Sequence, residues 1–194
     1  MGLIYIFGGN NMKILGIIGS MRTGNTYLMV MSTKEIFKEN DIHFETVHLK
    51  DLSFNFCNGC LKCDNTGVCY QDDDLNSIVE KIKEADGFIF ATPTRWSLLS
   101  GEMKTFLDRL NPLAMSELLS GKKAVVFAVG QTNKESNNVY SAANSIIEFC
   151  KNANIDVIDT VLAYECLNND DVLNKIDVLE NCKLAVKKLI NILQ

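Results

Sequence analysis

The stretch KILGIIGSMRTGNT, residues 13–26, decides the fold. Its first part, Lys13–Ile18, is a short apolar run, which is typical of a strand buried on both faces of a parallel sheet. A turn with two glycines, residues 19–25, follows at once, and residues 26–39 have the apolar spacing of a helix. A buried strand, a turn and a helix in this order begin a β-α-β unit.

The same alternation of strand and helix continues along the chain. We expect further strands at 43–49, 88–92, 124–129 and 155–162, and further helices at 73–85, 100–110, 138–153 and 172–193. Strands that alternate with helices form an α/β fold, in which a parallel sheet carries helices on both faces. Right-handed connections leave few arrangements, and the common five-strand order is 2-1-3-4-5. Ligands of such sheets bind outside the carboxyl ends of strands one and three.

Length and charge restrict the class of protein. The chain has 194 residues and a net charge of −5, from 19 Lys and Arg against 24 Asp and Glu. It is long enough for one domain with a sizeable core. The acidic balance argues against a nucleic-acid partner and against docking on an anionic membrane, because both need a basic face. Since no apolar stretch approaches the ~20 residues of a bilayer span, we expect a cytoplasmic protein.

The N-terminal residues have two interpretations. Met1–Asn11 lacks the basic start and the cleavage site of a signal peptide. One interpretation is a translated leader before a true start at Met12, because Gly8-Gly9 can be encoded by a purine-rich ribosome-binding sequence. The other is an ordinary extra strand. In both cases we assign residues 12–194 to a single domain, with a cysteine-rich loop at 51–72.

The first turn has the features of a phosphate site. Residues 19–24 fit the pattern G-x-x-x-x-G, but Asn25 stands where a nucleotide-hydrolysing loop has lysine. A triphosphate and its metal need that lysine, so a single terminal phosphate is the better match. Backbone N–H groups, the Asn25 amide, the Arg22 guanidinium and the hydroxyls of Ser20 and Thr26 would surround such a dianion. The alternative is an ordinary capped turn.

The loop after the third strand, residues 92–101, is the second candidate. It contains the only tryptophan, Trp96, next to Pro93, Thr94 and Arg95. A loop of this kind can lie along a flat heterocycle and offer it backbone N–H groups, and it follows the strand at which ligands are expected. The alternative is that Trp96 covers the core.

A run of cysteines gives the strongest single signal. It has the pattern Cys57-x2-Cys60-x2-Cys63-x5-Cys69. Thiolates spaced by two residues can bind neighbouring irons of one [4Fe-4S] cluster, and a fourth thiolate from a short loop can complete it. Zinc, a redox-active dithiol pair and no metal at all are the alternatives.

The remaining candidates have structural explanations. We expect the acidic run 72–74 to cap a helix rather than bind a metal. Cys150 and Cys182 fall in predicted helices, where a cysteine behaves as a small core residue. His43 and His48 lie on the second strand, away from the expected ligand.

Together these motifs resemble one known family. Residues 19–26, 92–104 and 106–109 (FLDR) are similar to the flavodoxin-like NAD(P)H-dependent FMN reductases, and the cysteine loop resembles their iron–sulfur flavoprotein branch. The resemblance runs from Met12 to about Asp159. It implies a flavodoxin-like three-layer sandwich that binds FMN.

The resemblance also implies a role for individual residues. It assigns the FMN phosphate to Ser20, Arg22, Asn25 and Thr26. It places the isoalloxazine ring along Pro93, Thr94, Arg95 and Trp96, with Val129, Gly130 and Gln131 on its far side. It gives the metal ligands as Cys57, Cys60, Cys63 and Cys69.

The implied reaction is electron transfer. NAD(P)H would deliver a hydride to the flavin, and electrons would leave to a small acceptor or through the cluster to a ferredoxin-like partner. This scheme needs no protein acid or base, so we name no catalytic side chain. The resemblance further implies a homodimer. One alternative is an electron carrier that takes electrons from a ferredoxin-like donor and has no turnover of its own on pyridine nucleotide. The others are a plain NAD(P)H-dependent FMN or quinone reductase without a cluster, and a zinc-binding or thiol-sensing module.

Overall fold

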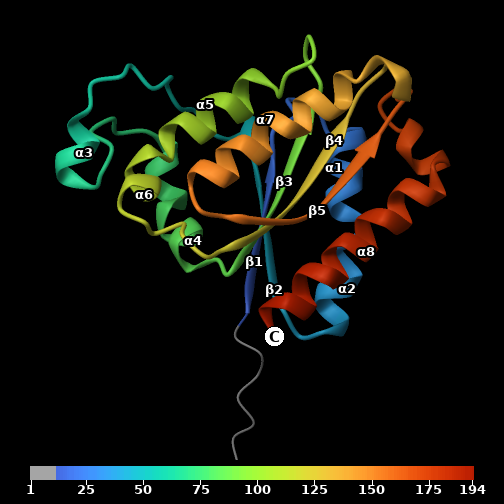
Figure 1. The fold of residues 1–194 in the computed structure, drawn as a ribbon, viewed down its shortest axis with the longest axis horizontal. Helices are drawn as coiled ribbons and strands as arrows, with labels where there is room; N and C mark the ends of the chain where they lie inside the picture. The colour runs from blue at the N-terminus through green and yellow to red at the C-terminus, as the bar shows by residue number, and fades with distance from the viewer. Residues whose placement is uncertain (1–11) are drawn as a thin grey trace, which may run out of the picture.

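Five parallel strands form the central sheet, in the order β2-β1-β3-β4-β5 (Figure 1). They are β1 (Lys13–Ile18), β2 (His43–His48), β3 (Gly87–Pro93), β4 (Lys123–Val129) and β5 (Asp156–Ala163). The computed structural model describes residues 12–194, so both interpretations of Met1–Asn11 lie outside the described residues. The α/β fold and the strand order expected from the sequence are confirmed.

Helices cover both faces of the sheet and complete three layers (Figure 1). One face carries α1 (Asn25–Met31), α2 (Lys34–Glu39) and α8 (Ile176–Leu193). The other carries α4 (Val79–Glu84), α5 (Gly101–Arg109) and α7 (Asn138–Asn152), with the short helices α3 (Lys62–Thr66) and α6 (Asn111–Met115) beside them.

Strand β3 shows how the sequence specifies these layers. All of its residues are buried. Phe88 and Phe90 pack into the core on the α5 side, whereas Ile89 and Ala91 pack into the core on the α1 side. Successive side chains of a strand point to opposite faces, so a continuous apolar run holds a helical layer on each side.

The helix expected at 26–39 is two helices. Ser32 and Thr33 separate α1 from α2, and their hydroxyls each donate to a main-chain carbonyl, of Met29 and Val30 respectively, at 2.7 Å. Hydroxyls that bond back into the preceding turn bend or interrupt a helix, which explains the break.

Two other predicted helices begin with 3₁₀ turns, η2 (Asp74–Ile78) before α4 and η4 (Asp171–Asn174) before α8. The Asp73 carboxylate accepts a hydrogen bond from the Leu75 N–H at 3.2 Å, which caps η2. The capping role expected for the acidic run is thus confirmed. The short helices α3 and α6 are absent from the sequence prediction, because five residues each give too little periodicity to recognise.

The carboxyl ends of β1 and β3 bring the two candidate loops together. The Gly19 N–H donates to the Ala91 carbonyl at 2.8 Å, and the Ser100 hydroxyl donates to the Gly19 carbonyl at 2.6 Å. A Cβ on Gly19 would lie 2.9 Å from the Cβ of Met103, so this close approach requires glycine.

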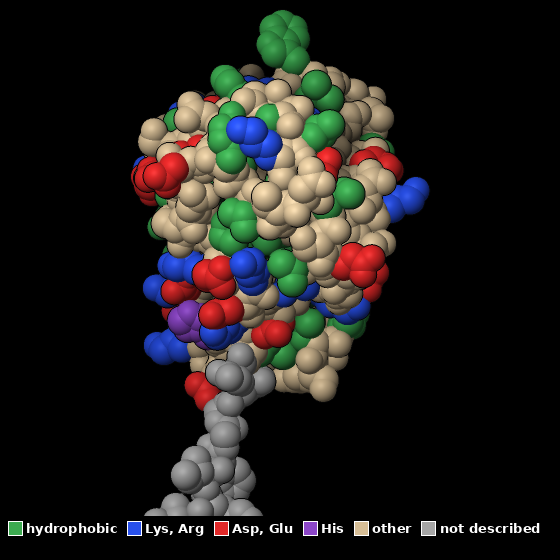
Figure 2. Space-filling view, turned by 90° about the vertical axis from the view of Figure 1, so that its left-hand side faces the viewer, with side chains coloured by type: hydrophobic (Ala, Val, Ile, Leu, Met, Phe, Trp, Pro, Cys, Tyr) green, Lys and Arg blue, Asp and Glu red, His purple; other side chains and the backbone are tan. Residues whose placement is uncertain are grey.

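Charged side chains of both signs mix on the surface. Figure 2, seen from the side of the cysteine loop, shows Lys, Arg, Asp and Glu gathered in the lower half, where the chain enters β1. This face therefore presents no continuous basic patch of the kind that nucleic acids need. Within residues 12–194 we find no helix with the length and apolar character of a bilayer span.

Candidate functional site

A cavity of about 440 Å³ opens at the carboxyl edge of the sheet, between the loops that follow β1, β3, β4 and β5. All of the predicted flavin-site residues line it, namely Ser20, Arg22, Asn25, Thr26, Pro93, Thr94, Arg95, Trp96, Gly130 and Gln131. The cavity lies where the direction of winding reverses, which is the expected position for a ligand in this topology. The structure thus brings residues from distant parts of the sequence to one site.

The turn between β1 and α1 contains a hydrogen bond of its own. The Ser20 hydroxyl accepts a hydrogen bond from the Arg22 N–H at 3.1 Å, and Ser20 and Thr26 are both buried. The Arg22 side chain is exposed and lines the cavity. Its charge is therefore free to meet an anion at this end of the cavity.

Strand β2 and the 3₁₀ turn after it, η1 (Leu49–Asp51), both contact the same turn, which the sequence analysis did not anticipate. The ring nitrogen Nε2 of His48 lies 2.7 Å from the Ser20 carbonyl, and the Lys50 ammonium donates to the Thr23 hydroxyl at 3.2 Å. Burial lowers the pKa of His48 below its ordinary value. His48 thus contacts the turn from outside the cavity, as a neutral donor to the Ser20 carbonyl.

Asn25 connects the turn to the segment after β5. Its side-chain N–H donates to the Asn168 carbonyl at 2.5 Å, and its side-chain oxygen accepts from the Val172 N–H at 3.0 Å. The Asp171 carboxylate in turn accepts from the N–H groups of Leu167 and Asn168, each at 2.7 Å. Asn25 lies at the cavity, but its amide already has partners within the chain.

Two buried hydroxyls in the cavity have no partner. Among the described residues, the side-chain oxygens of Thr94 and Thr132 are buried without a hydrogen bond, and both residues line the cavity. Buried polar groups in proteins are nearly always bonded, so unpaired ones at a cavity point to a polar ligand. Thr132 was missed from the sequence because it carries no motif, and Cys166, which also lines the cavity, was not assigned to it.

The loop between β3 and α5 projects beyond the carboxyl edge of the sheet as a tight hairpin turn (Figure 1), and its residues line the cavity. Arg95 and Leu98 exchange both main-chain hydrogen bonds, at 2.8 and 2.9 Å, and Trp96 and Ser97 have φ values of +49° and +64°. The Ser97 hydroxyl also donates to the Asn138 side chain at 2.9 Å. The Trp96 side chain is 98% exposed, so the alternative that it covers the core is wrong.

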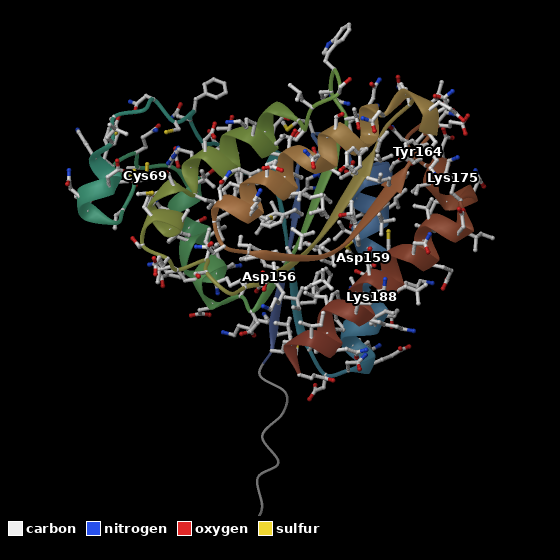
Figure 3. All side chains as sticks on the ribbon, in the orientation of Figure 1. Cys69, Asp156, Asp159, Tyr164, Lys175 and Lys188 are labelled. Atoms are coloured by element: carbon white, nitrogen blue, oxygen red, sulfur yellow. The ribbon has the colours of Figure 1, made fainter. Side chains whose placement is uncertain are left out.

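The cysteine loop forms a second cavity at the other side of the molecule. It measures about 320 Å³ and is lined by Cys57, Cys60, Cys63 and Cys69 together. Figure 3 shows Cys69 on the projecting loop near α3, far from Tyr164 and Lys175 beyond β5. The two cavities share no lining residue. The cysteine loop and the turn at 19–25 are therefore separate sites.

The four thiols fit an iron–sulfur cluster in type and number but do not yet converge. All are free, Cys57 and Cys60 are exposed, and Cys63 and Cys69 are partly buried. Within residues 12–194, no three His, Cys, Asp or Glu side chains lie close enough to hold a metal ion. The loop must contract if these thiols are to bind one cluster. Cys150 and Cys182 are buried in the core, as expected, and burial raises the pKa of each thiol to about 12.

A buried ion pair fixes the ends of the cysteine loop to α5. Arg109 donates to both carboxylate oxygens of Asp73, at 2.7 and 3.0 Å, and to the Asn55 carbonyl at 2.8 Å. Their side chains are only 1% and 7% exposed. Burial raises the pKa of the Asp73 carboxyl, but hydrogen bonds from Arg109 and from the Asn55 N–H outweigh it and hold that pKa below its ordinary value.

Comparison with known proteins agrees with this geometry. The family model of NADPH-dependent FMN reductases matches residues 12–160. An iron-sulfur flavoprotein of Methanocaldococcus jannaschii is 38% identical over 120 residues, which cover 61% of this chain and 62% of the relative. An iron-sulfur flavoprotein of Archaeoglobus fulgidus is 34% identical over 112 residues, which cover 57% of this chain and 51% of the relative. The match thus spans about half to three fifths of these relatives' lengths.

The fold has the same neighbours. A solved flavone reductase superposes with a TM-score of 0.71 at 21% sequence identity, over 90% of this chain and 60% of that one. At this level of identity the likeness concerns the fold alone. The family model, in contrast, matches from β1 into β5 and includes the loops after β1, β3 and β4 that line the cavity of about 440 Å³. The chain therefore belongs to the NADPH-dependent FMN reductase family.

Proposed function

We propose that the protein is an FMN-dependent oxidoreductase that accepts electrons from NAD(P)H. The observation that carries this proposal is the convergence of Arg22, the two unpaired hydroxyls of Thr94 and Thr132, and the Trp96 hairpin on one cavity. Charge at one end and polar groups on buried walls suit a flat heterocycle with a phosphate tail. Family membership supports the same cofactor.

The residues of the cavity divide the work of binding. Arg22 binds the phosphate through its guanidinium, and the turn amides and the Thr26 hydroxyl complete that end. The hydroxyls of Thr94 and Thr132 hydrogen-bond the polar edge of the ring, and the Trp96 hairpin bounds the entrance. Asn25 supports FMN binding indirectly. Its amide connects the turn to the segment after β5 and does not contact the phosphate.

When bound, FMN supplies the hydride and single-electron chemistry, whereas the protein supplies position and electrostatics. We name no catalytic side chain, because no step assigned to this chain requires a protein acid or base. The ends of β3 and β4, at Pro93 and Val129, line the cavity and would shield a bound flavin from water on that side.

Flavin loading and turnover test this function. Purified protein reconstituted with FMN should bind it in a 1:1 ratio and oxidise NADH or NADPH in the absence of oxygen, with a quinone or free flavin as acceptor. A protein that binds FMN but oxidises neither nucleotide would reject the reductase and leave an electron carrier. A protein that does not retain FMN would reject the proposal altogether.

The cysteine loop forms the second part of the proposal, a [4Fe-4S] cluster held by Cys57, Cys60, Cys63 and Cys69. The four thiols share one cavity, and metal binding can organise a loop that does not converge beforehand. A cytoplasmic location fits, because a reducing compartment keeps such thiols available. Electrons would then pass from the cluster to a ferredoxin-like partner. The protein itself would form a homodimer or a higher homo-oligomer.

Metal analysis separates the cluster from its alternatives. Protein made and kept without oxygen should contain about four irons and four sulfides per chain. Serine at any of the four positions should lower the iron content and leave FMN bound, whereas Cys182→Ala serves as the control. Zinc in place of iron would indicate the zinc module. Full flavin without any metal would leave the plain FMN or quinone reductase.

Light scattering of the same preparation tests the homodimer, and a monomeric mass would reject it.

A further inference from the structure

One buried N–H group of Arg109 has no hydrogen-bond partner among the described residues. The residue is 5% exposed, and its two terminal nitrogens are occupied by Asp73 and the Asn55 carbonyl. The third nitrogen, Nε, is buried and has no partner among the described residues. Arg109 and Cys69 both line the cysteine cavity and a neighbouring cavity of about 330 Å³, so the guanidinium lies beside that thiol.

Two residues of the same wall reach two different thiols. The Arg109 guanidinium carries its positive charge at this wall, because arginine stays protonated in proteins. The Asn111 side chain donates to the Cys63 sulfur at 3.3 Å. Cys57 and Cys60 lie on the exposed side of the cavity. Hydrogen bonds to Asp73 and Asn55 hold Arg109 in place at this wall. The exposed thiols of Cys57 and Cys60 would therefore have to move toward it if all four thiols are to bind one cluster.

We infer that Arg109 and Asn111 donate hydrogen bonds to the sulfur atoms of the bound cluster, and that the Arg109 charge sets its reduction potential. This inference rests on the cluster of the proposed function. A cluster with four thiolate ligands is negatively charged and gains a further negative charge on reduction. A buried cation and hydrogen bonds to sulfur stabilise the reduced state more than the oxidised state, so they raise the potential.

Asp73 and Arg109 should shift the reduction potential of the cluster in opposite directions, because their charges are opposite. Asp73 offsets part of the Arg109 charge at the cavity. Removing the cation should lower the potential, whereas neutralising the carboxylate should raise it. A purely structural ion pair would not move the potential in opposite directions, because breaking it from either side has the same effect on the loop.

The experiment is a dye-mediated redox titration followed by electron paramagnetic resonance, on anaerobic protein whose iron and sulfide are counted first. Arg109→Met should shift the one-electron equilibrium toward the oxidised cluster about tenfold, which is about 59 mV. Asp73→Asn should shift it in the opposite direction. Asn111→Leu, which leaves the ion pair intact, should lower the potential by a smaller amount.

Two further variants keep the test decisive. If Arg109→Met does not fold, the paired variant Arg109→Met with Asp73→Asn removes the pair without leaving a buried charge, and Arg109→Lys keeps the charge without the Nε donor. Both variants should lower the reduction potential of the cluster relative to the parent protein. The decrease should be smaller in Arg109→Lys than in Arg109→Met, because the lysine keeps the positive charge. A full cluster with the same potential in every variant would overturn this inference alone. A parent protein without iron would overturn the cluster and the inference together.

Discussion

The turn at residues 19–25 and the cysteine loop both serve negatively charged cofactors in our proposal, but the chain holds them differently. The turn lies at the carboxyl ends of the strands, and it is hydrogen-bonded to three other segments, through Ala91, Ser100 and His48. The loop is tied to α5 near its two ends, and its thiols remain apart. The turn is thus organised without its ligand, whereas the cysteine loop would be organised by the ligand that we propose for it.

The largest effect should come from cutting the tie of the cysteine loop. Asp73→Ala leaves the buried Arg109 charge unpaired and should cost about 3–5 kcal/mol of unfolding free energy, measured by urea denaturation. The matched control is Asp72→Ala, since Asp72 is exposed and makes one weak hydrogen bond, to Asn76 at 3.4 Å. Equal stability of the two variants would mean that the ion pair is not what holds the loop.

The second effect concerns the binding charge of the turn. Arg22→Ala should weaken FMN binding by about 1.5–3 kcal/mol, because it removes a charge-assisted hydrogen bond. This corresponds to roughly 10- to 100-fold in Kd, measured by quenching of flavin fluorescence. The stability of the flavin-free protein should not change, since the Arg22 side chain is exposed. Lys34→Ala, which removes an exposed charge on α2, is the control, and an equal loss there would reject the assignment.

A third variant asks whether Asn25 acts directly or through its neighbours. Asn25→Ala removes two hydrogen bonds to the segment after β5 and should lower the stability of the flavin-free protein by about 1–3 kcal/mol. FMN affinity should fall with it, and the loss should not add to that of Asp171→Ala, since both loosen the same segment. Weaker FMN binding at unchanged stability would show that Asn25 contacts the phosphate itself.

The smallest effect is a pH dependence on the turn side. The folded protein lowers the pKa of His48, so the unfolded chain binds more protons in the acidic range. Stability should therefore decrease as the pH falls below the ordinary histidine value of about 6.5, and should be insensitive to His48 above it. His48→Gln should flatten this slope in denaturation measured at several pH values. An unchanged slope in His48→Gln would show that His48 does not cause this dependence.

The same contrast explains what the sequence could predict. Strands such as β3 are recognisable by a continuous apolar run, here residues 88–91, and the turn at 19–25 is recognisable because its residues are neighbours in the sequence. The bonds from Asn25 to Asn168 and Val172 join residues far apart along the chain, and no local pattern announces them. The break between α1 and α2 depends on where two hydroxyls bond, which apolar spacing does not register.

For the cysteine loop, the spacing of the thiols predicts a ligand set but not a geometry. A loop of this length with few buried side chains has many conformations of similar energy, and only a bound metal would select one. The ion pair between Asp73 and Arg109 was equally invisible, because its partners belong to different segments and each has an ordinary explanation in the sequence.

The exposed Trp96 makes the protein its own optical reporter. It is the only tryptophan of the chain, and its indole is almost wholly in contact with water. Its emission in the isolated protein should resemble that of indole in water, and it should shift to shorter wavelength when a ligand, a nucleotide or another protein covers the hairpin. Energy transfer to a flavin bound in the cavity would quench the same signal. Arrival of the flavin and arrival of a partner can thus be followed separately, in one unlabelled sample.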